Sequence, residues 1–202
     1  MKEFAVLTGD LIGSTSLDAE EVERRLLSIK SALDEWYDGD PSHCFTRQSG
    51  DGWQAIVKNP KEALRVALFI KAWLKSKGPE RTTRIFIADG KSDIPESKNL
   101  NDATGDVFVL SGRGLNELPK RAELGHASGG ATAALVRLAD HISQDWTETQ
   151  AKVMRESLHP WATQTQIAKE QGVSQQSVQQ TQTAAGHHAL KEALSFIEGN
   201  AQ

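Results

Sequence analysis

The strongest constraint on the fold of this 202-residue chain is a pair of turns that each contain glycine and aspartate. Each turn lies next to an apolar run. The run 4–7 leads into a turn that contains Asp10, and Gly50-Asp51-Gly52 joins the runs 44–48 and 53–57. An Asp-Gly pair between two apolar runs is typical of a β-hairpin. Carboxylates at the ends of neighbouring strands can share one divalent cation. We therefore predict that Asp10 and Asp51 hold Mg²⁺ or Mn²⁺.

The residues after Asp10 indicate that a phosphate would accompany this metal. Gly13, Ser14 and Thr15 lead into a predicted helix, whose N-terminal amides and dipole favour anions. The carbonyl group of Leu11 is a further backbone ligand. These residues are predicted to bind a nucleotide. The alternative is that both segments are ordinary turns, since Gly-Asp and Asp-Gly pairs are common there.

The order of the predicted elements indicates an α/β fold. We expect a strand over 4–7, a helix from 18 that Asp18 and Glu21 cap reciprocally and that stops at 39–41, the hairpin over 44–57, a helix over 59–78 and a strand over 83–88. A polar loop over 89–104 and helices over 107–118 and 131–142 follow. The succession of strand, helix, hairpin, helix and strand predicts a ferredoxin-like α/β sandwich over residues 1–143.

Composition separates residues 144–202 from the rest and narrows the class of protein. Glutamine is dense and aromatic residues are absent between 164 and 182, which predicts a small all-helical module. The net charge of −4 excludes a polybasic binder. The single cysteine, Cys44, cannot form an intramolecular disulfide and is predicted to be a buried strand residue. Without a signal sequence or a membrane span, the chain is expected in the cytoplasm.

The two aspartate turns resemble those of a known enzyme family. The segments 10–15 and 50–52 are similar to the metal-binding motifs of class III nucleotidyl cyclases, and the element order over about 4–90 agrees. The whole layout resembles the SatD family, in which a shortened cyclase-like domain precedes a helix-turn-helix. The resemblance implies a metal–nucleotide site on a cyclase-like domain.

Two departures from the cyclase pattern bear on activity. Where those enzymes have a base-selecting lysine, this chain has Phe45, with Arg47 as the nearest cation. The later motif keeps Gly105 and Arg113 but has Val109 in place of an asparagine that orients the ribose. The resemblance implies that Arg113 would stabilise charge on a phosphate; an ordinary surface arginine is the alternative. Missing polar contacts reduce turnover, so nucleotide sensing is favoured over catalysis.

The segment 163–178 resembles the helix-turn-helix of bacterial regulators. A small residue where two helices touch (Ala168), a turn glycine (Gly172), a helix N-cap (Ser174) and a β-branched core residue (Val178) follow at the required spacing. A supporting helix is expected to begin at Thr147. A helical hairpin with a packing role alone is the alternative.

The second helix of this segment carries the predicted DNA-reading residues. These are Gln175, Gln176, Ser177, Gln179 and Gln180. Glutamine can pair bidentately with adenine in the major groove. Acidic residues outnumber basic ones after residue 144, so non-specific affinity for double-stranded DNA should be low, and a homodimer would compensate.

Together these features predict a DNA-binding transcriptional regulator whose cyclase-like domain senses a nucleotide with a divalent metal. One alternative is an active cyclase or related phosphoryl transferase that uses Asp10, Asp51 and Arg113 from the same or a partner chain. Another is a dimeric DNA-binding scaffold without ligand. His187 and His188 are expected to be structural, because no second cluster of metal ligands accompanies them.

Overall fold

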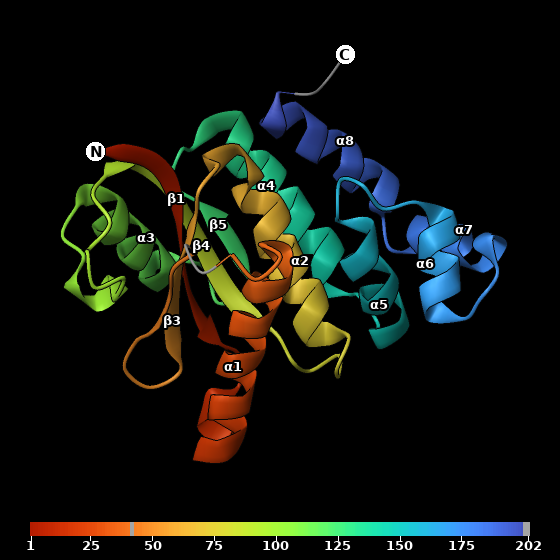
Figure 1. Ribbon diagram of the computed structural model, residues 1–202, viewed down its shortest axis with the longest axis horizontal. Helices are drawn as coiled ribbons and strands as arrows, with labels where there is room; N and C mark the ends of the chain where they lie inside the picture. Colours follow the sequence, from red (N-terminus) through yellow and green to blue (C-terminus); the bar gives the residue numbers. More distant parts are fainter. Residues whose placement is uncertain (41–42, 200–202) are drawn as a thin grey trace.

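The chain forms a mixed α/β structure around one five-stranded sheet (Figure 1). The computed structural model describes residues 1–40 and 43–199. Residues 41–42 and 200–202 lie outside the described residues; the first pair includes the last position of the predicted helix stop at 39–41, and 200–202 end the predicted segment 144–202. Within the described part there are five strands and eight α-helices, and none of these helices combines the length and apolarity needed to cross a membrane.

The sheet has the strand order β2-β3-β1-β4-β5. Its strands are β1 (Lys2–Leu11), β2 (Phe45–Arg47), β3 (Gly52–Val57), β4 (Thr83–Ser92) and β5 (Leu124–His126). All neighbours are antiparallel except β4 and β5, which are parallel. The first four strands confirm the predicted ones, although β1 and β4 are longer. The three-residue β5 was not predicted, because so short a segment shows no alternation.

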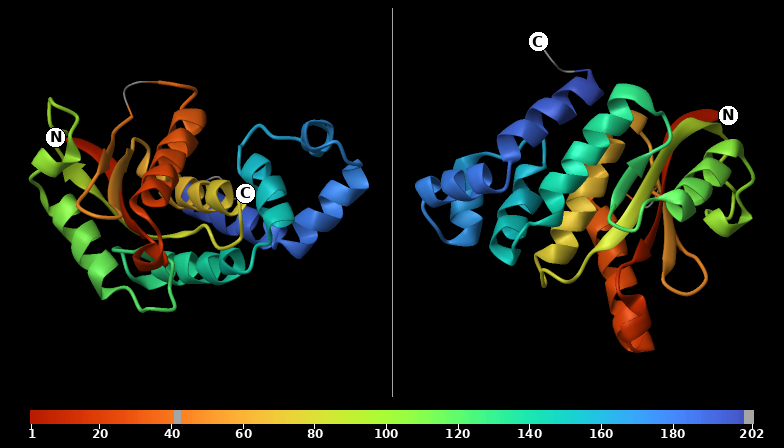
Figure 2. Two further views of the ribbon diagram at one scale, coloured as in Figure 1. Left: turned by 90° about the horizontal axis from the view of Figure 1, so that it is seen from below. Right: turned by 180° about the vertical axis from the view of Figure 1, so that it is seen from behind.

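Helices cover both faces of the sheet (Figure 2). One face packs against α1 (Ala19–Trp36), α2 (Ala63–Lys75) and α4 (Gly130–Gln144), and the other against α3 (Asp106–Glu117). The remaining helices are α5 (Glu148–Ser157), α6 (Gln164–Gln171), α7 (Gln175–Ala184) and α8 (His187–Glu198). Short 3₁₀ helices span Ser14–Ser16, Pro60–Glu62 and Leu100–Asp102. The predicted α/β class and its helices are confirmed.

The alternation along β1 explains the two layers of core. Ala5 and Leu7 face the layer of α1 and α2, whereas Phe4 and Val6 face α3. The larger core continues beyond residue 143, since it includes apolar side chains of α5 and α8 such as Met154. The C-terminal helices therefore pack directly on the α/β layers. The division of the chain at residue 143 stays a prediction.

Helix caps predicted from sequence are largely present. The side chain of Asp18 accepts a hydrogen bond from the amide of Glu21 at 2.7 Å. The return bond does not form, because the Glu21 carboxylate binds Arg25 instead. Thr147 begins α5 as expected, with a capping box that Gln150 completes.

The packing of α3 on the sheet predicts that alanine substitutions at two glycines of this helix change the stability of the protein in opposite directions. A Cβ atom at Gly114 would lie 2.1 Å from the ring of Phe86, whereas one at Gly112 would meet nothing within 4 Å. Gly114→Ala should lower the free energy of unfolding by about 1–3 kcal/mol, because the helix must move away from the ring. Gly112→Ala should raise it by up to about 1 kcal/mol through helix propensity. Urea denaturation measures both; equal stability of the two variants would contradict this packing.

Candidate functional site

The predicted partners Asp10 and Asp51 come from neighbouring strands at one end of the sheet. Asp10 lies near the end of β1, and its cross-strand partners are Gly52 on β3 and Arg84 on β4. Because Asp51 precedes Gly52, the hairpin turn that carries it adjoins Asp10. The register thus brings the two sequence segments together.

A guanidinium group, not foreseen from sequence, occupies this site. Arg84 Nε donates to Asp10 Oδ1 at 2.9 Å, and Arg84 Nη2 donates to Asp10 Oδ2. The pKa of Arg84 is raised, first by its hydrogen bond to Asp10 and then by the negative charges of Asp10 and Asp51, against an opposing effect of burial. A bidentate pair of this kind is geometrically specific. The pairing of Arg84 with Asp10 depends on the register between β1 and β4. This register cannot be predicted from local sequence patterns.

The Arg84 pair bears directly on metal binding. Both oxygens of Asp10 accept hydrogen bonds from Arg84, so a divalent cation would have to share or displace the guanidinium. Mg²⁺ commonly uses one or two carboxylates, which is the number that Asp10 and Asp51 offer. No group of three or more metal-ligating His, Cys, Asp or Glu residues occurs among the described residues. The donors fit Mg²⁺ in kind, with Arg84 as its competitor.

The expected phosphate-binding helix N-terminus differs from the prediction. Gly13 has a φ of 73°, and Ser14 and Thr15 lie in a separate 3₁₀ turn. Helix α1 begins only after Asp18, whose carboxylate caps it, and two further acidic residues lie in its first turn. These charges take the place that an anion would use. What remains of the predicted phosphate loop is the 3₁₀ turn and the end of β1 at Leu11, which is buried.

The structure separates Arg47 from Asp10. Arg47 on β2 is the cross-strand partner of Trp53, whose ring lies in the core beneath α1. Its guanidinium pairs with Glu23 of α1 and donates to the Gly50 carbonyl at 3.2 Å. Asp10 shares the parity of the β1 residues that face α3. Arg47 therefore lies on the opposite face of the sheet and supports the hairpin.

Arg113 lies on α3 but points away from the sheet. Ser111 and Gly114 of the same helix are buried against the sheet, whereas Arg113 is exposed. The Ser111 and Thr8 hydroxyls are hydrogen-bonded at 2.7 Å, and Gln54 Nε2 donates to Thr8 Oγ1 at 3.0 Å. This buried polar chain beneath α3 was not predicted. Arg113 is thus exposed to solvent on α3.

The segment 163–178 forms two helices joined by a tight turn. Gly172 ends α6 with a φ of 66°, and the Val173 amide donates to the Ala168 carbonyl at 3.0 Å. Ser174 caps α7 by accepting from the Ser177 amide at 3.1 Å. A separate core cluster at this junction contains Val153, Ile167, Ala168 and Val178. Each residue of the predicted pattern occupies its expected packing or capping position.

The five predicted DNA-contact residues of α7 are all exposed, but two of them are hydrogen-bonded to other side chains of the protein. Gln175 Nε2 donates to the Thr165 hydroxyl at 2.9 Å, and the Ser177 hydroxyl is bonded to the Ser174 hydroxyl at 2.9 Å. With Val178 and Gln182 buried, helical geometry places Gln176 and Gln180 on the opposite side. These two glutamines, with Gln179 beside them, form the outer face of α7.

Comparisons with known proteins do not assign this chain to a family. No protein-family model matches the sequence. A comparison with curated proteins also gives no match.

Removing the Arg84 guanidinium should strengthen cation binding at Asp10. Arg84→Met keeps most of the side-chain length but frees both carboxylate oxygens, so the affinity for Mn²⁺ should rise about tenfold, equivalent to about 1.4 kcal/mol. Paramagnetic titration with Mn²⁺ alone measures this. Adding Asp10→Asn to the variant should abolish the gain, and Arg113→Met is the matched control. An unchanged Mn²⁺ affinity in Arg84→Met would show that Asp10 is not a metal ligand.

Proposed function

We propose that this protein is a DNA-binding transcriptional regulator that acts as a homodimer and whose α/β domain senses a nucleotide together with Mg²⁺. The observation that carries the first part is the outer face of α7. In this proposal α6 and α7 are a helix-turn-helix, and α7 enters the major groove of double-stranded DNA.

The packing of α5, α6 and α7 supports this assignment. The small side chain of Ala168 and the positive φ of Gly172 allow the close, angled approach that a DNA-reading helix pair requires. Apolar residues of α7 are turned inward, which leaves a row of amide side chains outside. Gln176 and Gln180, one helical turn apart, suit bidentate contacts with adenine.

The charges near α7 explain why a dimer is part of the proposal. Lys152 is paired with Glu148 at 2.6 Å, and Arg155 is paired with the adjacent Glu156. These pairs leave few cations for DNA phosphates, so one module would bind weakly. Two modules on adjacent half-sites would gain affinity through their effective concentration.

The sheet supports the sensing part of the proposal. The antiparallel strand order β2-β3-β1-β4, with α1 and α2 as crossovers, agrees with a ferredoxin-like sandwich. Asp10 and Asp51 would hold the cation, which would supply positive charge to the nucleotide phosphates. Arg84, once released from Asp10, would be available to a phosphate. Ligand and metal would thus exchange the partners of an existing ion pair.

Nucleotide turnover has less support than sensing. A transition-state arginine must be held in place beside the reacting phosphate, and Arg113 is exposed on α3 without an ion pair or hydrogen bond to another described residue. Sensing requires binding alone, with different affinities for two arrangements of the protein.

The DNA-reading face predicts the effect of two glutamine substitutions. Sequences enriched from a pool of random duplexes by the wild-type protein would serve as the probe. Gln176→Ala and Gln180→Ala should each weaken binding to them by about 1–3 kcal/mol, because each removes a bidentate base contact. Fluorescence anisotropy measures the affinities. Gln48→Ala, on the distant hairpin, is the control and should not change them. Failure to enrich any sequence, or full affinity of both variants, would refute the helix-turn-helix proposal.

The sensing site predicts a joint requirement for the two aspartates. Calorimetry with ATP and with GTP, each with Mg²⁺, should show binding to the wild-type protein that Asp10→Ala and Asp51→Ala each reduce at least about tenfold, since each removes a charged ligand. Arg113→Ala should bind the nucleotide with wild-type affinity, because the proposed sensing site does not include Arg113. Absence of nucleotide binding while specific DNA binding persists would leave only the scaffold alternative.

A further inference from the structure

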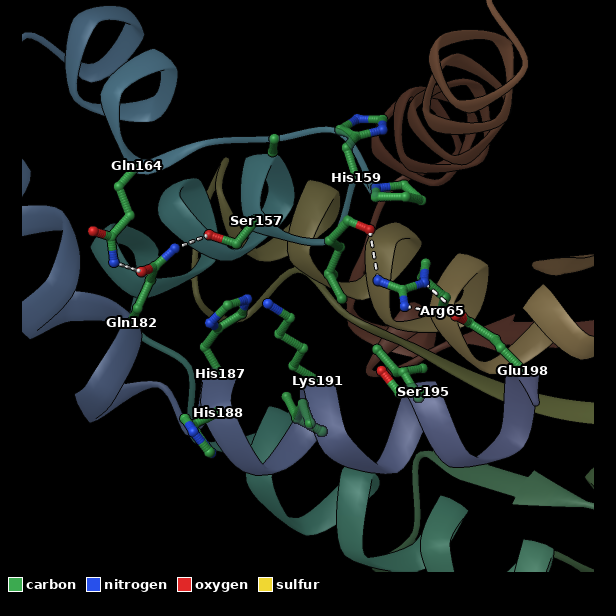
Figure 3. A pocket seen from close by; sticks show the side chains of 15 residues that line it. Arg65, Ser157, His159, Gln164, Gln182, His187, His188, Lys191, Ser195 and Glu198 are labelled. Carbon is green, nitrogen blue, oxygen red and sulfur yellow. Dashed lines mark hydrogen bonds and ion pairs between the residues drawn. The ribbon is translucent and has the colours of Figure 1, made fainter. Parts of the chain in front are cut away.

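A cavity of about 530 Å³ lies where the C-terminal helices meet α2 (Figure 3). Its wall combines Arg65 of α2, the chain between α5 and α6, Gln182 of α7 and the inner side of α8. This volume is in the range of small-molecule sites. The cavity is separate from Asp10 and from the outer face of α7, and neither proposed function uses it.

The cavity carries an excess of positive charge. Glu198 is the one carboxylate among its described lining residues, and it is bound by Arg65 through two nitrogen–oxygen contacts of 2.6 and 2.8 Å. Lys191 makes no ion pair with any described residue. Figure 3 shows the ends of His187 and Lys191 close together inside the cavity. The Arg65 charge is balanced within the protein, whereas that of Lys191 is left for a ligand.

The surroundings of His187 agree with this charge distribution. Burial lowers the pKa of His187, and the neighbouring Lys191 lowers it further, whereas a hydrogen bond to the Ser157 backbone raises it. His188 and Arg65 are additional positive neighbours that lower it. No acidic group contributes to this shift. A bound anion would supply the missing negative charge.

The rest of the wall provides hydrogen bonds and apolar surface. Gln164 Nε2 donates to Gln182 Oε1 at 2.9 Å, and Gln182 Nε2 donates to the Ser157 hydroxyl at 2.8 Å. This amide chain closes one end of the cavity in Figure 3. The apolar lining residues include Pro160, which is exposed, and Ala162, which is partly buried, whereas Leu158, Leu190 and Leu194 are buried. A ligand with an anionic head and a small apolar body would meet both kinds of surface.

We propose that this cavity binds a small organic anion, with His187 and Lys191 holding its phosphate or carboxylate head and the apolar wall at Pro160 and Ala162 contacting its apolar body. The proposal is independent of nucleotide and DNA binding. Because the cavity joins α2, α7 and α8, the bound anion would connect the α/β layers to the proposed DNA-reading helices. The site thus suits an effector that stabilises one arrangement of these helices.

Calorimetry on the full chain with phenyl phosphate, benzoate and benzamide tests this proposal. At least one of the two anions should bind, and their relative affinities distinguish a phosphate from a carboxylate head. Benzamide, which is neutral and similar in size to benzoate, should bind at least about tenfold more weakly than the better anion, because it lacks the charge-assisted contacts. The midpoint temperature of thermal unfolding should rise when the anion is bound.

Matched variants locate the site. Lys191→Met, at an exposed position whose replacement leaves the core unchanged, should weaken binding of the better anion about tenfold, and His187→Gln combined with it should weaken binding further. Lys120→Met, outside the cavity, should bind as the wild type does. Absence of binding by both anions at millimolar concentration, equal binding of benzamide, or unchanged affinity in Lys191→Met would each overturn the proposal.

Discussion

The buried ammonium group of Lys71 is the interaction on which the arrangement of the layers depends. All thirteen residues of α2 are buried, and Lys71 near its middle is fully enclosed. Its Nζ contacts Glu123 at 2.8 Å, Ser143 at 2.9 Å and Asp140 at 3.3 Å. A buried charge without partners costs several kcal/mol, so these contacts are obligatory once α2 is enclosed. They fix the start of β5 and the end of α4 relative to α2.

The same burial explains why the C-terminal helices adjoin the α/β layers. A helix that is buried all round needs cover on every side. The sheet and α1 cover one side of α2, while Met154 of α5, Leu158 directly after it and Leu194 of α8 belong to the core that encloses it. Arg65 reaches from α2 to Glu198 at the end of α8. Any displacement of the C-terminal helices would therefore disturb contacts of α2 with the α/β layers.

Local patterns in the sequence predicted what depends on neighbouring residues. The strands, the hairpin, the helix that Thr147 caps and the tight turn at Gly172 all follow from short-range spacing, and the structure contains each of them. Features that depend on distant partners were missed. The short β5 exists because it pairs with β4, and Arg84 reaches Asp10 only through strand register. Arg47 and Arg113 were assigned from the resemblance to cyclase motifs, and such a resemblance does not tell which way a side chain points.

Charge balance distinguishes the two candidate ligand sites. At Asp10 the protein already supplies a cation, because Arg84 binds both carboxylate oxygens, so a metal ion must share or displace the guanidinium. This internal competitor lowers the apparent affinity of the site for its ligand, because only molecules in which the ion pair is open can bind. In the cavity beside α8, Lys191 has no acidic partner among the described residues, and an anion would meet no internal competitor for it. The two sites would therefore bind ligands of opposite charge. A cation at the sheet would compete with Arg84 for Asp10, whereas an anion at the junction of α2 with the C-terminal helices would bind Lys191 without breaking an ion pair.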